Sequence, residues 1–325
     1  MIVLSEQDIS DLLPMGAAIE VIERTMRAVA TGGAELPLRF AMPVGGDNFM
    51  GVMPGALNEP ACFGVKLVSL FPGNPARGLS SHRGAIVLFE AETGAAIAMM
   101  DAGLLTALRT AAASAVATRA LAQENAEILA ILGIGEQAWH HLQAICAVRP
   151  IDELRIAGRD AQRTARFAKR AANAFPALQI SHGTDVEKAV AGADILCSVT
   201  ASPTPILKGA WLPKGAHVNL VGASHAGVRE VDDAVVTRSD IWVDYLPSAL
   251  AQAGEIVDMI KAGNLDASDL KGEIGNVLNG TAVGRAHPKQ ITLYRSLGVA
   301  AQDLACAWYA FEKASFSGRG QQVEI

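Results

Sequence analysis

Residues 128–138 read Ile128-Leu-Ala-Ile-Leu-Gly-Ile-Gly-Glu-Gln-Ala138, and this stretch decides the fold. An apolar run leads into Gly133-x-Gly135-x-x-Ala138, and a helical pattern follows over 137–148. A strand, a glycine turn and a helix in this order form the context of a dinucleotide-binding fingerprint. The first glycine permits the tight turn, the second lets backbone approach a pyrophosphate, and the small third residue allows close helix–strand packing. The stretch therefore predicts a nucleotide site; the alternative is an ordinary glycine-rich turn.

The end of the next predicted strand, residues 153–157, indicates which nucleotide binds. Gly158-Arg159-Asp160 follow this strand. In NAD-specific sites an acidic residue here accepts hydrogen bonds from the ribose hydroxyls, whereas an arginine accommodates a 2′-phosphate. Arg159 stands at this position, where the side chain distinguishes a 2′-phosphate from ribose hydroxyls, and Arg163 follows one helical turn later. The sequence therefore favours NADPH, with NADH as the alternative. Asp160 is either a ribose acceptor or a helix N-cap.

Size and composition indicate a globular protein of 325 residues, which suggests two domains. The net charge of −6 and the lack of a basic cluster with interleaved aromatic residues argue against a nucleic acid partner. Cys62, Cys146, Cys197 and Cys306 are far apart in the sequence, so we expect reduced thiols and no metal site. We find no basic signal segment and no apolar stretch of roughly 20 residues, and therefore expect a cytoplasmic protein without a membrane partner.

The first third of the chain has the pattern of an antiparallel sheet with helices. A helical region is predicted over 5–30 and a long helix over 102–122. Strand-like runs lie between them, over 36–42, 49–54, 62–71, 85–90 and 95–100. Turn signals at residues 45–48 and 92–94 separate several of these runs, which favours antiparallel pairing.

Strands and helices alternate from residue 127 to about 241, which favours a parallel, doubly wound sheet. The strands are predicted near 128–132, 153–157, 178–181, 194–199, 217–221 and 240–243. A last helix over 299–314 is expected to pack back on the first domain. The predicted fold is α/β: a Rossmann-type domain at 121–298 and a mainly antiparallel α+β domain at 1–120, completed by 299–325.

Two cations interrupt apolar patterns in the first domain. Lys66 lies in the strand 62–71, which is apolar on both faces apart from Lys66 and Ser69. Arg109 lies beside an apolar stripe of the helix 102–122. Buried cations need an anionic partner or a changed pKa. Lys66 is therefore either a buried functional group or a lysine that reaches the sheet edge, and Arg109 binds an anionic ligand or forms a structural ion pair.

Two further places are weaker candidates. Arg39 alternates with Leu38 and Phe40, and its position alone predicts a solvent-facing side chain. Residues 72–83 form a twelve-residue loop with no predicted structure, and loops of this length are often functional. Ser81 and His82 are its ligand candidates; the alternative for His82 is an ordinary hydrogen-bonded loop histidine.

Several segments together resemble the ornithine cyclodeaminase/μ-crystallin family over nearly the whole chain. The resemblance is specific because a leucine–threonine–alanine–arginine helix accompanies the lysine strand. The segments that carry it are Pro37-Leu-Arg39, Gly64-Val-Lys66, Asn74-Pro75, Gly78-Leu79, Leu105-Thr-Ala-Leu-Arg-Thr-Ala-Ala112, Leu132-Gly-Ile-Gly-Glu-Gln-Ala138, Asn219-Leu-Val-Gly-Ala223 and Ser296-Leu-Gly298.

This resemblance implies a homodimer that binds an imino or amino acid and a nicotinamide nucleotide. Arg39, Lys66 and Arg109 would hold the substrate carboxylate, with Ser224 and Leu297 near the substrate. Lys66 would either protonate the imine nitrogen or polarise the carboxylate. Besides Gly133, Gly135 and Ala138, the implied nucleotide contacts are Ser81, Arg109, Glu136, Gln137, Arg159, Thr200, Val221, Gly222, Ala223, Ser224 and Ser296.

One departure from the family pattern bears on the reaction. Ornithine cyclodeaminases and the related archaeal alanine dehydrogenase carry a catalytic aspartate where this sequence has Ser224. A neutral hydroxyl cannot act as a carboxylate base, so the sequence is similar to the ketimine reductase branch, where hydride reaches the C=N carbon and a proton reaches nitrogen. The expected reaction is reduction of Δ1-pyrroline-2-carboxylate to L-proline, and of Δ1-piperideine-2-carboxylate to L-pipecolate. The alternatives are an ornithine cyclodeaminase or amino-acid dehydrogenase, and a non-catalytic protein that binds NADPH and a small ligand.

Overall fold

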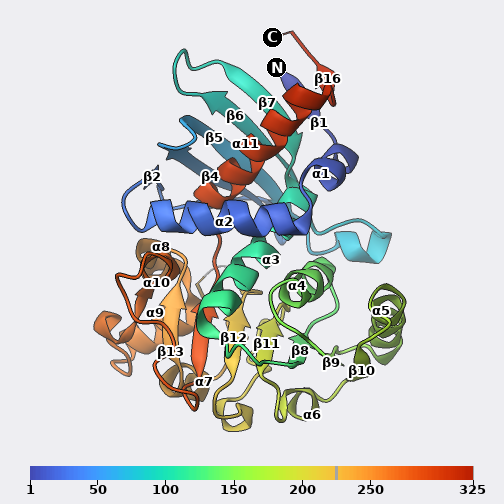
Figure 1. The fold of residues 1–325 in the computed structure, drawn as a ribbon, viewed down its shortest axis with the longest axis vertical. Helices are drawn as coiled ribbons and strands as arrows, with labels where there is room; N and C mark the ends of the chain where they lie inside the picture. Colours follow the sequence, from blue (N-terminus) through green and yellow to red (C-terminus); the bar gives the residue numbers. More distant parts are fainter. Residues whose placement is uncertain (224–225, 325) are drawn as a thin grey trace. The chain divides into compact units, whose positions relative to one another are not determined.

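The computed structural model describes residues 1–223 and 226–324 (Figure 1). The chain divides into two compact units: Met1–Thr110 with Gly298–Ile325, and Ala111–Leu297. The first boundary lies inside helix α3 (Ala102–Leu121), whereas the sequence pattern placed it at 120/121. The second half of α3 belongs to the second unit because its side chains bond there: Ser114 Oγ lies 2.9 Å from His141 Nε2, and Thr118 Oγ1 accepts from Asn219 Nδ2 at 2.9 Å.

The first unit contains a mixed sheet in the order β16-β1-β7-β6-β5-β4-β2, with β3 also paired to β4. Its pairs are antiparallel except for β1 with β7, which is parallel. The strands are β1 (Ile2–Leu4), β2 (Ala34–Glu35), β3 (Phe40–Gly45), β4 (Asn48–Leu57), β5 (Cys62–Leu70), β6 (His82–Glu90), β7 (Ala96–Asp101) and β16 (Gln321–Gln322). The helices are α1 (Glu6–Leu12), α2 (Met15–Val29), the short η1 (Asn74–Arg77) and α11 (Ala300–Ser317), which runs along β4, β5 and β6 (Figure 1).

Strand β5 shows why this sheet has two different faces. Cys62, Gly64 and Lys66 point to one face and are buried, and a Cβ at Gly64 would meet Leu304 Cδ2 of α11 at 2.8 Å. Glycine at this position therefore lets α11 approach the strand. Phe63 points to the other face, remains 39% exposed and stacks on Phe89 with ring centroids 5.0 Å apart. By strand register this outer face also carries Phe40, Met42 and Met99, all exposed, and we call it the apolar sheet face.

The second unit is built on a parallel sheet in the order β10-β9-β8-β11-β12-β15-β13-β14. Its strands are β8 (Ile128–Leu132), β9 (Glu153–Ala157), β10 (Gln179–Gly183), β11 (Ile195–Ser198), β12 (His217–Leu220), β13 (Asp240–Val243), β14 (Gly272–Glu273) and β15 (Thr292–Arg295). Its helices are α4 (Glu136–Cys146), α5 (Ala161–Ala174), α6 (Val186–Val190), α7 (Asp233–Arg238), α8 (Leu246–Gln252), α9 (Gly254–Lys261) and α10 (Ile274–Leu278), with the short η2 (Gly209–Trp211) and η3 (Ala267–Asp269). The strand order reverses between β8 and β11, and ligands of such sheets bind at this point, outside the carboxyl ends of the strands.

The structure differs from the sequence predictions at several places. Strand β3 begins at Phe40, so Arg39 precedes it instead of lying in a strand over 36–42. The loop 72–83 contains η1, and His82 already belongs to β6. Strand β15 was not predicted, although it lies between β12 and β13. Within the described ranges, no helix is both long and apolar enough to cross a membrane.

Candidate active site

The glycine turn after β8 has the geometry that a bound pyrophosphate requires. Gly133 has φ +115°, and a Cβ there would lie 2.8 Å from Val199 O, which follows β11. Gly135 is the N-cap of α4, which has no side-chain cap, and no atom lies within 4 Å of its Cβ position. The first N–H groups of α4 and the positive end of its dipole therefore suit an anion. Ala138 is buried, Glu136 is exposed and Gln137 is half-buried in the same first turn.

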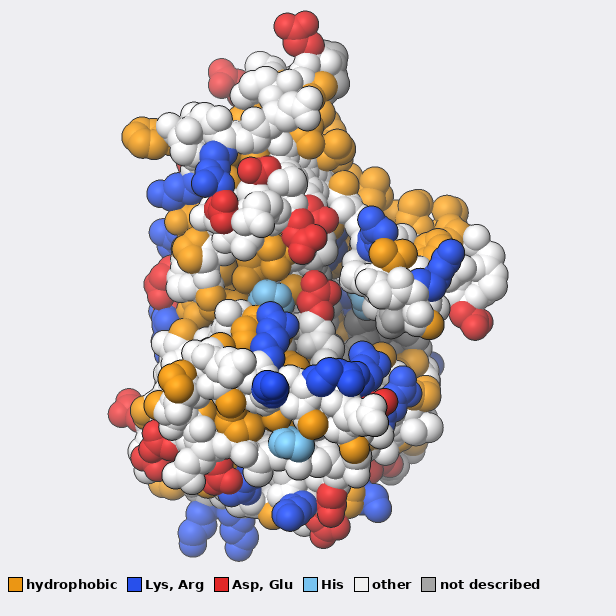
Figure 2. All heavy atoms as spheres, turned by 90° about the vertical axis from the view of Figure 1, so that its right-hand side faces the viewer, with side chains coloured by type: hydrophobic (Ala, Val, Ile, Leu, Met, Phe, Trp, Pro, Cys, Tyr) orange, Lys and Arg blue, Asp and Glu red, His pale blue; other side chains and the backbone are white. Residues whose placement is uncertain are grey.

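Asp160 is the N-cap of α5, which is one of the two roles that the sequence predicted for it. Its Oδ1 accepts a hydrogen bond from the Arg163 N–H at 2.9 Å, and this bond is the main cause of the lowered pKa of its carboxyl group. Arg159 precedes it and is exposed, as are Arg163 and Arg166. Figure 2 views the molecule from the side of α5, where Lys and Arg side chains gather on the second unit. The side chains at the end of β9 and the start of α5 that could contact a 2′-phosphate are thus positively charged.

The other implied nucleotide residues of the second unit follow neighbouring strands. Thr200 follows β11, Val221 to Ala223 follow β12, and Ser296 and Leu297 follow β15. Ser296 Oγ is buried and has no hydrogen-bond partner among the residues described, and the same holds for Gln137 Oε1. Such unpaired buried polar atoms fit a site that a polar cofactor completes. Ser224 lies outside the described residues.

A charged cluster lies in the core of the first unit: Lys66 on β5, Arg109 on α3 and Asp303 on α11. Lys66 Nζ lies 2.9 Å from Asp303 Oδ2 and 3.0 Å from Oδ1, and Arg109 Nε donates to Oδ1 at 2.9 Å. Arg109 Nη1 also donates to Gln302 Oε1 at 3.0 Å. Lys66 is 2%, Arg109 4% and Asp303 0% exposed. We name Lys66, Arg109 and Asp303 the charged triad.

The charged triad bears on two alternatives that the sequence left open. Lys66 does not reach the sheet edge, because its side chain is buried. Arg109 forms the structural ion pair that was one of its alternatives, and Asp303 is the anion for both cations. The sequence did not identify Asp303, although one signal was present: it is an acidic residue in the alanine-rich helix that follows Val299, and a charge in such a pattern had identified Lys66 and Arg109.

Two cations share one carboxylate in the charged triad, and this affects Lys66 most. Burial, followed by the positive charge of Arg109, lowers the pKa of Lys66 to about 7, although Asp303 opposes the shift. The charge of Arg39 also lowers this pKa, so the half-buried Arg39 acts on the same group. An added anion would relieve the repulsion between these cations, so the cluster suits the binding of a carboxylate. Ser81 belongs to the same unit, with Oγ 3.0 Å from His82 Nδ1.

Comparison with known proteins identifies the family. Residues 1–318 match the model of the ornithine cyclodeaminase/mu-crystallin family. The chain belongs to this family. It is 33% identical over 285 residues to the ketimine reductase mu-crystallin of Mus musculus, covering 87% of both chains.

Two solved structures are similar over nearly the full length. One is Thermococcus litoralis Δ1-pyrroline-2-carboxylate reductase in complex with NADH and L-proline, with 34% identity, a TM-score of 0.96, and coverage of 99% of this chain and 100% of that one. The other is an archaeal alanine dehydrogenase dimer with bound NAD, with 30% identity, a TM-score of 0.94, and coverage of 100% and 99%. These comparisons confirm the predicted family and fold class. They also support the predicted enzyme class, because the similar ketimine reductase and Δ1-pyrroline-2-carboxylate reductase are oxidoreductases.

Replacing Asp303 tests the charged triad. Asp303→Asn leaves buried cations without their anion, and the free energy of unfolding should fall by about 3–5 kcal/mol. The loss should be largest near pH 6, where Lys66 is charged. Asp233→Asn is the matched control, because it removes the same charge from an exposed i,i+4 pair with Arg229 and should cost at most about 1 kcal/mol. Urea unfolding measures both; equal losses would contradict a buried charge cluster.

Proposed function

We propose that this protein reduces cyclic ketimine carboxylates with a nicotinamide nucleotide. The first substrate is Δ1-pyrroline-2-carboxylate, which gives L-proline, and the second is Δ1-piperideine-2-carboxylate, which gives L-pipecolate. The observation that carries the proposal is the charged triad, where two buried cations share one carboxylate and can accept a second. The likeness to a reductase in complex with NADH and L-proline supports it.

Residues of the first unit would hold the substrate and one proton. Arg109 and Arg39 bind the substrate carboxylate, and Lys66 either donates its proton to the imine nitrogen or polarises the carboxylate. A pKa of about 7 suits a general acid near neutral pH. The nucleotide supplies a hydride to the C=N carbon, so that one hydride and one proton convert the imine to the amine.

A single set of assays separates the three candidate functions. The proposal predicts oxidation of NADPH or NADH with both cyclic imines, and no comparable release of ammonia from ornithine with NAD. The favoured nucleotide is NADPH. Ammonia release as fast as imine reduction would instead show a cyclodeaminase or dehydrogenase. Nucleotide binding without turnover of either imine would show a non-catalytic binding protein.

The role of Lys66 has a signature in the pH dependence. If its ammonium group donates the proton, kcat/KM should fall as pH rises through about 7, because the free enzyme loses the donor. Lys66→Arg keeps the charge across this range, so this limb of the profile should vanish. Lys66→Met should lower kcat roughly 10²–10⁴-fold. Arg109→Met is the control for carboxylate binding and should raise KM roughly 10- to 100-fold. A Lys66→Met enzyme that folds and keeps the parent rate would refute the catalytic role.

Arg159 is proposed to bind the 2′-phosphate of NADPH. Arg159→Asp should weaken NADPH binding roughly 10- to 100-fold, because one charge-assisted contact is lost, and should change NADH binding little. Arg170→Asp makes the same charge change at the far end of α5, where the guanidinium carbon lies 3.5 Å from the Trp139 ring centroid, and should preserve the nucleotide preference. Fluorescence titration of each variant with NADPH and with NADH measures the two affinities. An unchanged preference in Arg159→Asp would rule out this assignment.

We also propose a homodimer formed through the apolar sheet face. Phe40, Met42, Phe63 and Met99 are too exposed on one sheet for a monomer in water, and the similar alanine dehydrogenase is named as a dimer. Phe63→Asp should convert a dimer, twice the 33.9 kDa chain, to a monomer. Leu250→Asp is the matched control, because Leu250 is equally exposed, at 39%, in the second unit. Sedimentation velocity measures the oligomeric state of each protein. A wild-type monomer, or a Phe63→Asp variant that remains a dimer, would contradict the proposal.

A further inference from the structure

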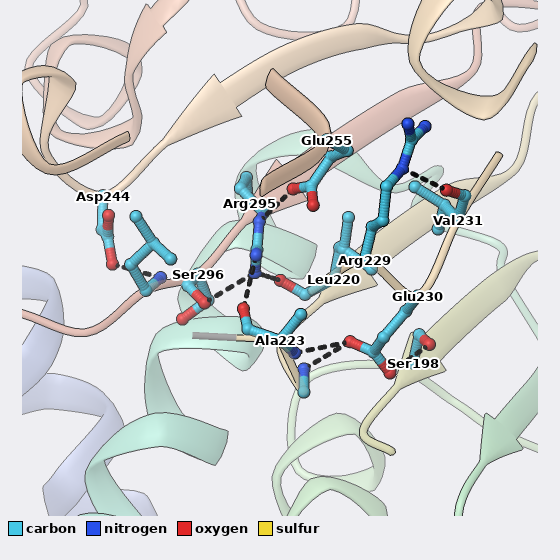
Figure 3. Close-up of polar contacts among 12 residues, drawn as sticks. Ser198, Leu220, Ala223, Arg229, Glu230, Val231, Asp244, Glu255, Arg295 and Ser296 are labelled. Atoms are coloured by element: carbon cyan, nitrogen blue, oxygen red, sulfur yellow. Dashed lines mark hydrogen bonds and ion pairs between the residues drawn. The ribbon is translucent and has the colours of Figure 1, made fainter. Parts of the chain in front are cut away.

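A buried carboxylate joins the segments that follow β11 and β12 (Figure 3). Glu230 Oε1 accepts hydrogen bonds from Ser198 Oγ at 2.8 Å, and from the Thr200 N–H and Oγ1 at 2.9 and 2.8 Å. Its Oε2 accepts from the N–H groups of Gly222 and Ala223, at 2.6 and 3.0 Å. Glu230 is 0% exposed, so a single side chain fixes both segments from inside the second unit.

A buried guanidinium holds the second of these segments through its carbonyl groups. Arg295, at the end of β15, donates from Nη1 to Leu220 O at 3.2 Å and from Nη2 to Ala223 O (Figure 3). Its Nε forms an ion pair with the buried Glu255. Ala223 is therefore held at its N–H by Glu230 and at its carbonyl by Arg295, which leaves its backbone little freedom.

The geometry of the peptide unit determines what this segment presents to a ligand. In a trans peptide the C=O points opposite to the N–H of the next residue. The N–H groups of Gly222 and Ala223 point to Glu230, so the carbonyls of Val221 and Gly222 point away from it. Among the residues described, none donates a hydrogen bond to either carbonyl. The segment thus offers a ligand two hydrogen-bond acceptors, the carbonyls of Val221 and Gly222. The N–H groups of Gly222 and Ala223 are already bonded to Glu230.

Two paired carbonyls select a ligand group that donates hydrogen bonds. Phosphate oxygens only accept, so they cannot bind there. The segment follows β12, which lies beyond the strand-order reversal from β9 and Arg159, where the adenosine half is proposed to bind. In the other half of the nucleotide, the NH₂ of the nicotinamide carboxamide carries two N–H donors on one nitrogen, which matches a pair of acceptors, whereas each ribose hydroxyl carries a single donor.

We propose that Glu230 is a positioning residue that aims the carbonyls of Val221 and Gly222 at the nicotinamide carboxamide, with Arg295 as the opposing anchor. This inference rests on the proposed function, because it assumes a nicotinamide nucleotide. Glu230 touches neither cofactor nor substrate; it acts by occupying the two N–H groups. It therefore sets which nucleotide ring the segment accepts and how that ring is oriented.

The test compares NADP⁺ with its 3-acetylpyridine analogue, in which a methyl group replaces the carboxamide NH₂. Calorimetric titration of the wild-type protein should show about tenfold tighter binding of NADP⁺, because the analogue cannot donate to the carbonyls. Glu230→Gln should bind both nucleotides with nearly equal affinity. Whichever way its amide is turned, the NH₂ group faces a backbone N–H group, so it cannot hold both segments as the carboxylate does. Glu230→Asp is the second variant; it keeps the charge but has a shorter reach, and should also reduce the preference.

Asp194→Asn is the matched control at the opposite end of the sheet. Asp194 Oδ2 accepts from the N–H groups of Glu127 and Ile128, both at 2.9 Å, where β8 and β11 begin. This variant removes a similar carboxylate clamp and should keep the tenfold preference. The inference is overturned if the wild-type protein shows no preference, if both Glu230 variants retain it, or if Asp194→Asn loses it equally. A protein that shows the preference but reduces no imine would refute the proposed function alone.

Discussion

The bond from the Asp303 carboxylate to Lys66 and Arg109 is the constraint on which the first unit depends. Burying two cations is costly without an anion, so α11 must return from the end of the chain to the sheet. Gly64 makes room for α11 on β5, and a Cβ at Gly298 would lie 2.9 Å from Arg109 Nη2. Asp303 thus links the C-terminal segment of this unit to its N-terminal segment. One carboxylate shared by two cations leaves the charged triad with a net positive charge, which favours the binding of an anion.

The second unit uses buried charge in a different way. Glu230 and Arg295 touch backbone groups at the carboxyl ends of the strands, and they fix the segments that the family resemblance assigns to the nucleotide. Backbone that follows a strand is otherwise free to move, because the ladder of hydrogen bonds has ended. A charged side chain with several hydrogen bonds holds such backbone firmly. In both units, therefore, buried charges lie at or next to the residues that we propose to bind a ligand.

The sequence predicted more of the fold than of the site. The glycine turn, the alternation of strands and helices and the family were readable because each is a local pattern. Lys66 and Arg109 were identified because each interrupts an apolar pattern, but their shared partner Asp303 lies 237 residues from Lys66, and no local pattern connects them. Strand β15 was missed because Thr292-Leu-Tyr-Arg295 is short and has a polar residue at each end, so no apolar run marks it, although all four residues are buried. No sequence pattern pointed to Glu230, because its proposed role depends on backbone N–H groups and not on particular side chains.

The central claim is that the charged triad binds the carboxylate of a cyclic imino acid. A crystal structure of the protein with NADP⁺ and L-proline tests it most directly. We expect the proline carboxylate to lie within hydrogen-bonding distance of Lys66 Nζ and the Arg109 guanidinium, while Asp303 stays bonded to both cations. A proline carboxylate held by other groups, with the charged triad unchanged and out of reach, would contradict a role of the charged triad in substrate binding.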